Sequence, residues 1–181
     1  MRIFISGGCK NGKSTFAQRL AKQQQEDSNN TSLYYVAAMN AQDSEDEERI
    51  AKHRREREGW GFTTIEQYSR IEGILERCDP KGSFLLDSLT ALLANEMFTA
   101  KEGVNLHAHE QISRGLLLLL NQISRIVIVS DYIYSDAFVY DPLTEAYRKS
   151  LAALDRLAAA HCDVVLEAAY TQIIVHKGTV P

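Results

Sequence analysis

The first fourteen residues constrain the fold of this chain more than any other stretch. Residues 2–6 are mostly apolar and indicate a short buried strand, and residues 7–14 match the pattern G-x-x-x-x-G-K-[ST] at every fixed position. Gly7 and Gly12 can adopt backbone angles that other residues avoid, so the loop can wrap an anion with its amide groups. A helix that begins near Lys13 would direct the positive end of its dipole at the same anion. The sequence therefore predicts a nucleotide-phosphate loop.

This pattern assigns roles to individual groups of the loop. Lys13 would reach the β- and γ-phosphates, and the Ser14 hydroxyl would ligate Mg²⁺. The strand before the loop and the amphipathic run at residues 15–22 supply the context that the motif requires, which argues against a glycine-rich turn without a ligand. The residues expected to contact the nucleotide are Gly7, Gly8, Cys9, Lys10, Asn11, Gly12, Lys13 and Ser14.

Composition narrows the class of protein. The 181 residues suffice for a single domain with a substantial core, spanning 1–181, and a net charge of −4 gives no general basic surface for nucleic acid. Cys9, Cys78 and Cys162 are far apart and match no zinc pattern. Since no signal peptide is evident, we expect reduced thiols in a cytoplasmic protein. The longest apolar run, residues 116–120, is far too short to cross a membrane.

Segments with strand and helix patterns alternate along the chain. Strands are expected at residues 2–6, 33–37, 60–65, 83–87, 125–130, 163–167 and 172–176. Helices are expected from Lys13 onward and at 44–58, 70–78, 89–98, 106–123 and 142–161. Ser44 and Glu47 indicate a capping box, and Asp141 caps the last helix. The alternation predicts a three-layer α/β fold with a mainly parallel sheet and an antiparallel pair of strands at its C-terminal edge.

In such a sheet, ligands bind at the carboxyl ends of the strands. That edge would carry the phosphate loop together with residues 37–38, 87–88 and 130–131. Asp87 ends a buried strand, where phosphate-loop enzymes place a carboxylate that holds Mg²⁺ directly or through water. The competing interpretation is an acid at a helix N-terminus beside the Ser88 cap, and the presence of a phosphate loop favours the metal role.

The second helix carries an unusual row of basic residues. Arg49, His53 and Arg57 lie one turn apart on one helix face. The simplest interpretation is a solvated helix that is acidic at its start and basic later, as the helix dipole favours. A histidine among arginines can instead be a nucleophile toward phosphorus, because neutral imidazole is available near pH 7 and guanidinium groups hold phosphates. Spacing does not decide between them. Arg148 is similarly open between a phosphate contact and an ordinary surface position.

Taken together, these stretches resemble the bifunctional adenosylcobinamide kinase / adenosylcobinamide-phosphate guanylyltransferase family of cobalamin biosynthesis. The resemblance covers almost the whole chain and is carried by residues 5–14, 34–38, 46–54, 85–90, 147–148 and 157–160, among others. Its most specific part is the run Arg49-Ile50-x-x-His53, because the matching histidine of that family becomes covalently guanylylated. The chain differs from the usual family residues at Asp87, at 131–134 and at 152–156.

The resemblance implies a RecA-like P-loop NTPase fold and two reactions. ATP or GTP would phosphorylate the aminopropanol hydroxyl of the corrinoid, and GMP from GTP would then pass through His53 to the new phosphate. Lys13, Asp87 and His53 would be catalytic, with Mg²⁺ near Ser14 and Asp87. Arg49, Arg54 and Arg57 are candidates to stabilise the developing charge. The family is usually a homotrimer with active sites between subunits, so a homo-oligomer is expected.

Two functions of other classes stay open at this point. One is a phosphate-loop kinase of a different small alcohol, in which His53 is only structural. The other is a non-catalytic nucleotide-binding switch, which would bind nucleotide tightly and turn it over slowly or not at all.

Overall fold

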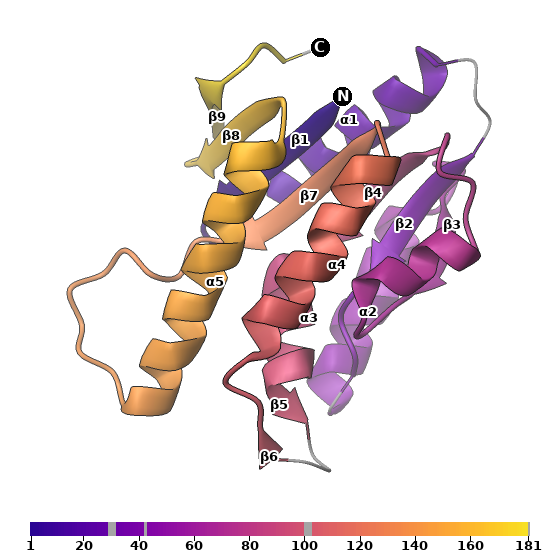
Figure 1. The fold of residues 1–181 in the computed structure, drawn as a ribbon. Coiled ribbons are helices and arrows are strands. Elements are labelled where there is room, and N and C mark those ends of the chain that lie inside the picture. The colour runs from indigo at the N-terminus through magenta and orange to yellow at the C-terminus, as the bar shows by residue number, and fades with distance from the viewer. Residues whose placement is uncertain (29–31, 42, 100–102, 181) are drawn as a thin grey trace.

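The computed structural model describes residues 1–28, 32–41, 43–99 and 103–180, and its main feature is a seven-stranded sheet (Figure 1). The strand order is β3-β2-β4-β7-β1-β8-β9, and every neighbouring pair is parallel except β8 and β9. The strands are β1 (Arg2–Gly7), β2 (Leu33–Ala37), β3 (Thr63–Glu66), β4 (Ser83–Asp87), β7 (Ile126–Asp131), β8 (Val164–Ala169) and β9 (Gln172–Lys177). The predicted α/β class and its antiparallel C-terminal edge are confirmed.

Helices cover both faces of the sheet. The first face carries α1 (Lys13–Glu26), and the opposite face carries α3 (Leu89–Met97), α4 (Ala108–Gln122) and α5 (Pro142–His161) (Figure 1). The charged helix α2 (Ser44–Glu56) has no buried residue within its bounds. Within the described part of the chain, no helix is both long enough and apolar enough to span a membrane.

Two apolar clusters form the core, one on each face of the sheet. Side chains alternate across a strand, so Ile3 and Ile5 pack toward α1 while Phe4 packs toward the three-helix face. Because β4 and β7 are covered on both faces, their sequences are continuous apolar runs rather than alternating ones. The carboxyl ends of the parallel strands lie at one edge of the sheet, where Gly7 is in register with Asp131 and Ala37 with Asp87.

The structure corrects several predicted boundaries. Gly59 and Gly61 have φ angles of 80° and 82°, so the chain turns there and β3 begins only at Thr63. The predicted helix at 70–78 is a 3-10 helix, η1 (Ile71–Glu76), and α4 begins at Ala108. The short strands β5 (Phe98–Thr99) and β6 (Gly103–Val104), which pair with each other, were not predicted from the sequence.

The predicted capping box of α2 is wrong by one residue. Asp43 is the N-cap, and its Oδ1 accepts a hydrogen bond from the Asp46 backbone N–H at 2.9 Å. A carboxylate carries more negative charge to the helix start than a serine hydroxyl does, so Asp43 also suits the helix dipole better. The predicted caps of α3 and α5 are confirmed, since Ser88 accepts from Ala91 and Asp141 accepts from Leu143 and Thr144.

The packing of α5 can be tested with a pair of leucines. Leu154 on α5 is fully buried, whereas Leu118 on α4 is 47% exposed. We expect Leu154→Ala to lower the free energy of unfolding by about 2–5 kcal/mol, because it removes buried apolar surface and leaves a cavity. Leu118→Ala should change it by about 0.5 kcal/mol or less. Urea denaturation measures both, and similar losses in the two variants would contradict the packing of α5 on the sheet.

Candidate active site

The loop between β1 and α1 has a geometry suited to an anion. Gly12 precedes α1 in the left-handed region with φ 85°, and Lys10 also has a positive φ of 56°. No side chain caps the first turn of α1 within the described residues, so its amide groups are available to phosphate oxygens. The Asn11 side-chain amide donates to the Ala168 carbonyl oxygen, which ties the loop to the end of β8.

Gly7 is required for a reason that the sequence did not indicate. Its φ angle is not positive, so the backbone freedom predicted for both glycines is used at Gly12. A Cβ atom at Gly7 would lie 2.4 Å from the Ala168 carbonyl oxygen and 2.9 Å from the Asn11 side-chain nitrogen. Because the nearer atom belongs to the backbone, a side chain at Gly7 would displace the loop from β8.

Lys13 is buried against this loop. Its Nζ donates to the Gly8 carbonyl oxygen at 3.1 Å and forms an ion pair with Asp131 Oδ1 at 2.6 Å. Only 6% of Lys13 is exposed, so its ammonium group has a fixed position at the mouth of the loop. The sequence placed Asp131 at the same sheet edge but did not indicate this contact.

Asp87 is oriented by an aromatic and a cationic neighbour. The Tyr35 hydroxyl donates to Asp87 Oδ2 at 2.8 Å, and the Arg57 guanidinium carbon lies 3.5 Å from the centroid of the Tyr35 ring. Burial raises the pKa of the Tyr35 hydroxyl and the Asp87 charge raises it further, so this hydroxyl stays a donor. Burial lowers the pKa of Arg57. In the described part of the chain, Asp87 Oδ1 takes no hydrogen bond and is open to a ligand.

Sequence reasoning missed Tyr35, although a signal for it exists. In parallel strands β2 and β4, Ala37 pairs with Asp87, and Tyr35 pairs with Leu85. Residues two apart share a face of the sheet, so Tyr35 and Asp87 lie on the face that packs toward α1. The strand order needed to use this signal comes only from the tertiary structure.

His53 lines a cavity of about 540 Å³ between α2 and the carboxyl ends of β2, β3 and β4. Asp87 lines the same cavity. The Nδ1 atom of His53 is buried and has no hydrogen bond within the described residues. A cavity of this volume is in the range of small-molecule sites, so His53 lies in a candidate binding site rather than on a solvated helix face.

The three arginines of α2 and its C-terminus have different surroundings. Arg54 lines the cavity and pairs with Glu66 at 2.6 Å, whose other oxygen accepts from the Tyr68 hydroxyl at 2.8 Å. Arg57 is 7% exposed beside Tyr35. Arg49 has a 56% exposed side chain, pairs with Asp46 at 3.6 Å and does not line the cavity. Arg54 and Arg57 are therefore better positioned than Arg49 to contact a bound ligand.

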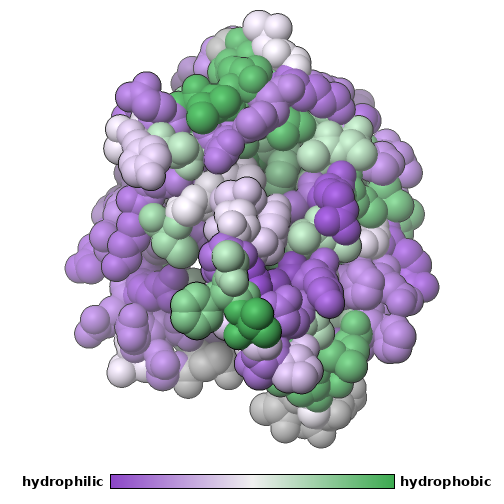
Figure 2. Space-filling model, turned by 90° about the vertical axis from the view of Figure 1, so that its left-hand side faces the viewer, coloured by the Kyte–Doolittle hydropathy of each residue, from purple (hydrophilic) through white to green (hydrophobic). Residues whose placement is uncertain are grey.

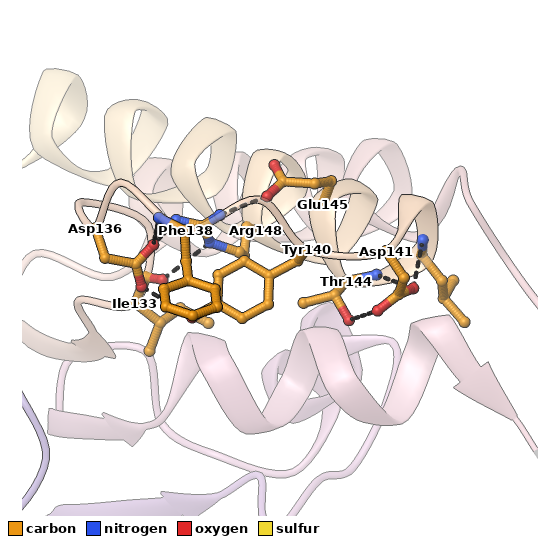
Figure 3. Close-up of polar contacts among 9 residues, drawn as sticks. Ile133, Asp136, Phe138, Tyr140, Asp141, Thr144, Glu145 and Arg148 are labelled. Carbon is orange, nitrogen blue, oxygen red and sulfur yellow. Dashed lines mark hydrogen bonds and ion pairs between the residues drawn. The ribbon is translucent and has the colours of Figure 1, made fainter.

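Arg148 has neither of the two positions considered from the sequence. It is 7% exposed, and it pairs with Asp136 at 2.9 Å and with Glu145 at 2.5 Å (Figure 3). Its Nε donates to the Ile133 carbonyl oxygen at 3.2 Å, and its guanidinium carbon lies 4.6 Å from the centroid of the Tyr140 ring. With its donors engaged in this way, Arg148 attaches the segment 132–141 to α5 instead of binding phosphate.

The segment that Arg148 attaches carries exposed apolar side chains. Phe138 and Val139 are 74% and 91% exposed. Figure 2 views the molecule from this side and shows hydrophobic side chains among hydrophilic ones. The segment leaves β7 directly after Asp131, so it begins beside the phosphate loop.

A buried acid lies on α5 beneath the start of this segment. Asp155 is 3% exposed, and its Oδ2 accepts a hydrogen bond from the Tyr134 hydroxyl at 2.9 Å. Burial raises the pKa of Asp155 to about 6, and the Asp131 charge adds to this rise while the Ser130 and Tyr134 hydroxyls oppose it. The sequence did carry a signal, because Asp155 falls on the apolar stripe of Leu151, Leu154 and Ala158.

Comparison with known proteins identifies a family that matches most of the chain. Residues 3–171 match the family described as "Cobinamide kinase / cobinamide phosphate guanyltransferase". The chain belongs to this family. It is 27% identical over 166 residues, 91% of each chain, to the "Bifunctional adenosylcobalamin biosynthesis protein CobP" of Pseudomonas aeruginosa. The resemblance predicted from the sequence is confirmed.

One solved structure supports the fold alone. A KaiC-like protein from the hyperthermophilic archaeon Pyrococcus horikoshii aligns with a TM-score of 0.52 at 12% sequence identity. The alignment covers 97% of this chain and 78% of that chain. The three-layer α/β architecture of this family member is therefore shared with a much more distant protein, although no common activity follows from it.

The Arg148 contacts predict the behaviour of the segment 132–141. We expect Arg148→Ala to release it, because both ion pairs and the contact with the Tyr140 ring are lost together. Limited proteolysis should then cut the variant between β7 and α5 at least several times faster than the wild-type protein. Lys149→Ala, on the exposed side of the same helix, is the control. Equal cleavage of both variants would show that other contacts fix the segment.

Asp155 predicts a pH dependence of stability. Its pKa in the folded protein is above the usual value, so folding favours the protonated form and stability falls as pH rises from about 4 to about 7. The loss is on the order of 3 kcal/mol at most. Asp155→Asn keeps an acceptor for Tyr134 but cannot ionise, so this contribution disappears. Urea denaturation at pH 4.5 and pH 7 should show the variant gaining stability relative to wild type at the higher pH. An unchanged difference would contradict the raised pKa.

Proposed function

We propose that the protein phosphorylates the aminopropanol hydroxyl of adenosylcobinamide and then transfers GMP from GTP to the resulting phosphate through His53. The observation that carries this proposal is the position of Asp87. It lines the cavity of His53, and its strand is separated from the phosphate-loop strand β1 only by β7. Family membership and the similarity to the Pseudomonas aeruginosa protein support a role in cobalamin biosynthesis.

The first step is phosphoryl transfer, which depends on positioning and charge neutralisation. Amide groups at the start of α1 would bind the triphosphate, and the buried ammonium group of Lys13 would contact its terminal phosphates. Gly8 and Asp131 use two of the three donors of the Lys13 ammonium group, so the third would be left for a phosphate oxygen. Because Lys13 is already held in place, little reorganisation would accompany binding.

The second step uses His53 as the nucleophile. An imidazole nitrogen attacks the α-phosphorus of GTP, the bond to the bridging oxygen breaks, and pyrophosphate leaves. Arg54 in the cavity and Arg57 beside Tyr35 are the arginines best placed to stabilise the charge that develops. The phosphoramidate at His53 then passes GMP to the corrinoid phosphate.

The oxygen donors at the sheet edge fit Mg²⁺. Asp87 Oδ1 has no hydrogen bond within the described residues, and Tyr35 fixes the other oxygen, so the carboxylate is oriented for a hard cation. Ser14 lies in the first turn of α1 and would supply a hydroxyl ligand. Mg²⁺ bound there would neutralise charge on the phosphates, and phosphate oxygens and water would complete its shell.

The family and the cysteine thiols suggest how the protein assembles and where it acts. We propose that residues 1–181 act as one catalytic domain and assemble as a homo-oligomer, as the resemblance to the family implies. The three cysteines are free, which suits a cytoplasmic protein that uses nucleoside triphosphates.

Two variants separate the two proposed reactions. Lys13→Ala should remove all nucleotide-dependent activity, because both reactions use the phosphate loop. His53→Ala should lose GMP transfer by at least about a thousandfold and keep phosphorylation of adenosylcobinamide. After incubation with GTP and Mg²⁺, intact-protein mass should show a GMP adduct on wild type but not on His53→Ala.

His161→Ala is the matched histidine control, because His161 lies at the exposed end of α5 and outside the cavity. It should form the adduct as wild type does. A kinase activity lost equally in the Lys13 and His53 variants would contradict the division of roles. An acid-labile adduct on His53→Ala would exclude His53 as the nucleophile.

A further inference from the structure

The contact between Lys13 and Asp131 joins the phosphate loop to the end of β7. Rigid elements fix this carboxylate. Asp131 is in register with Gly7, and the Asp131 backbone N–H donates to Thr90 Oγ1 at 2.8 Å. The next residue, Tyr132, donates its N–H to the Gly7 carbonyl oxygen at 3.0 Å. Asp131 is therefore held by the sheet and by the first turn of α3, not by a loose loop.

The position of Asp131 relative to a bound nucleotide follows from that of Lys13. A lysine at this place in the phosphate loop contacts the phosphoryl group that is transferred. Asp131 Oδ1 lies 2.6 Å from the same ammonium group, so it would be within about 5–6 Å of an oxygen of that phosphoryl group. An acceptor hydroxyl can occupy a gap of this width, since reacting atoms are about 3–3.5 Å apart before transfer.

Asp131 is also accessible and has an oxygen available to accept a proton. Its side chain is 25% exposed, and its Oδ2 takes no hydrogen bond in the part of the chain that the structure describes. The ammonium group of Lys13 lies between the carboxylate and the phosphates, which reduces the repulsion between these negative groups. One oxygen can thus contact Lys13 while the other faces an incoming substrate.

We propose that Asp131 is a catalytic residue of the phosphoryl-transfer step and acts as its general base. This inference deepens the proposed function and rests on it. The acceptor hydroxyl oxygen forms a bond to the γ-phosphorus of ATP, and the bond from that phosphorus to the β–γ bridging oxygen breaks. The hydroxyl proton passes to Asp131, and ADP leaves with the electron pair of the broken bond. The proton returns to solvent when the product leaves.

The two acids at the sheet edge then have separate tasks. Asp87 has one oxygen held by Tyr35 and lines the cavity of His53, whereas Asp131 contacts Lys13. Both continue the row of side chains that packs toward α1, but Asp131 extends two residues farther along the sheet, since Asp87 is in register with Val129. The proton acceptor is therefore the acid on the phosphate-loop side, and it does not take part in GMP transfer.

The test compares Asp131→Asn and Asp131→Glu with Glu167→Gln. Glu167 is the matched control, because it lies near the end of β8, on the other side of β1, and contacts His176 rather than Lys13. Three quantities are measured for each protein: the rate of phosphoryl transfer from ATP to adenosylcobinamide, the affinity for ATP, and formation of the GMP adduct. Hydrolysis of ATP without an acceptor is measured as well, because water then replaces the alcohol.

We expect Asp131→Asn to lower phosphoryl transfer and hydrolysis by at least about a hundredfold. ATP affinity should be equal to or tighter than that of wild type, because the amide removes a negative charge beside the phosphates. The GMP adduct should form normally, Asp131→Glu should recover part of the rate, and Glu167→Gln should behave as wild type.

Other results overturn the proposal. A transfer rate within threefold of wild type in Asp131→Asn would exclude a base at this position, and a parallel loss of ATP affinity would assign Asp131 to nucleotide binding instead. If wild type hydrolyses ATP but does not phosphorylate adenosylcobinamide, the proposed substrate is wrong. The role of Asp131 is then decided by the hydrolysis rates of wild type and Asp131→Asn.

Discussion

Parallel pairing of the strands is the constraint on which the rest of this structure depends. It brings the carboxyl ends of β2, β4, β7 and β1 to one edge, although these ends are far apart in the sequence. The pairing is close at β1 and β8, where only a glycine fits at position 7 beside the Ala168 carbonyl oxygen. The phosphate loop can wrap an anion because that close approach fixes where it starts.

Positive side chains at this edge of the sheet lie beside negative or aromatic partners. Lys13 pairs with Asp131, Arg54 pairs with Glu66, and Arg57 lies over Tyr35 next to Asp87. Groups arranged to bind phosphate would repel one another if they lacked anionic partners, so the carboxylates stabilise the protein before nucleotide arrives.

The segment between β7 and α5 is held by contacts with α5. Tyr134 donates to the buried Asp155, and Arg148 holds the segment through Asp136 and Glu145. These contacts form a network whose partners on the helix side all lie on α5. Phe138 and Val139 of this segment stay largely exposed.

The sequence by itself determined the class of fold, the phosphate loop and the family, because each depends on local pattern: apolar runs, glycine spacing and the residues around His53. It also placed Asp87 and Asp131 at the ends of strands. Only the tertiary structure decided which of these groups meet, because contacts between Lys13 and Asp131, or between Tyr35 and Asp87, depend on strand order and register. The burial of Arg148 was decided in the same way, since its partner Asp136 is twelve residues away and reaches it only through the path of the chain between β7 and α5. Local sequence sets the chemistry of each side chain, and long-range packing sets its partner.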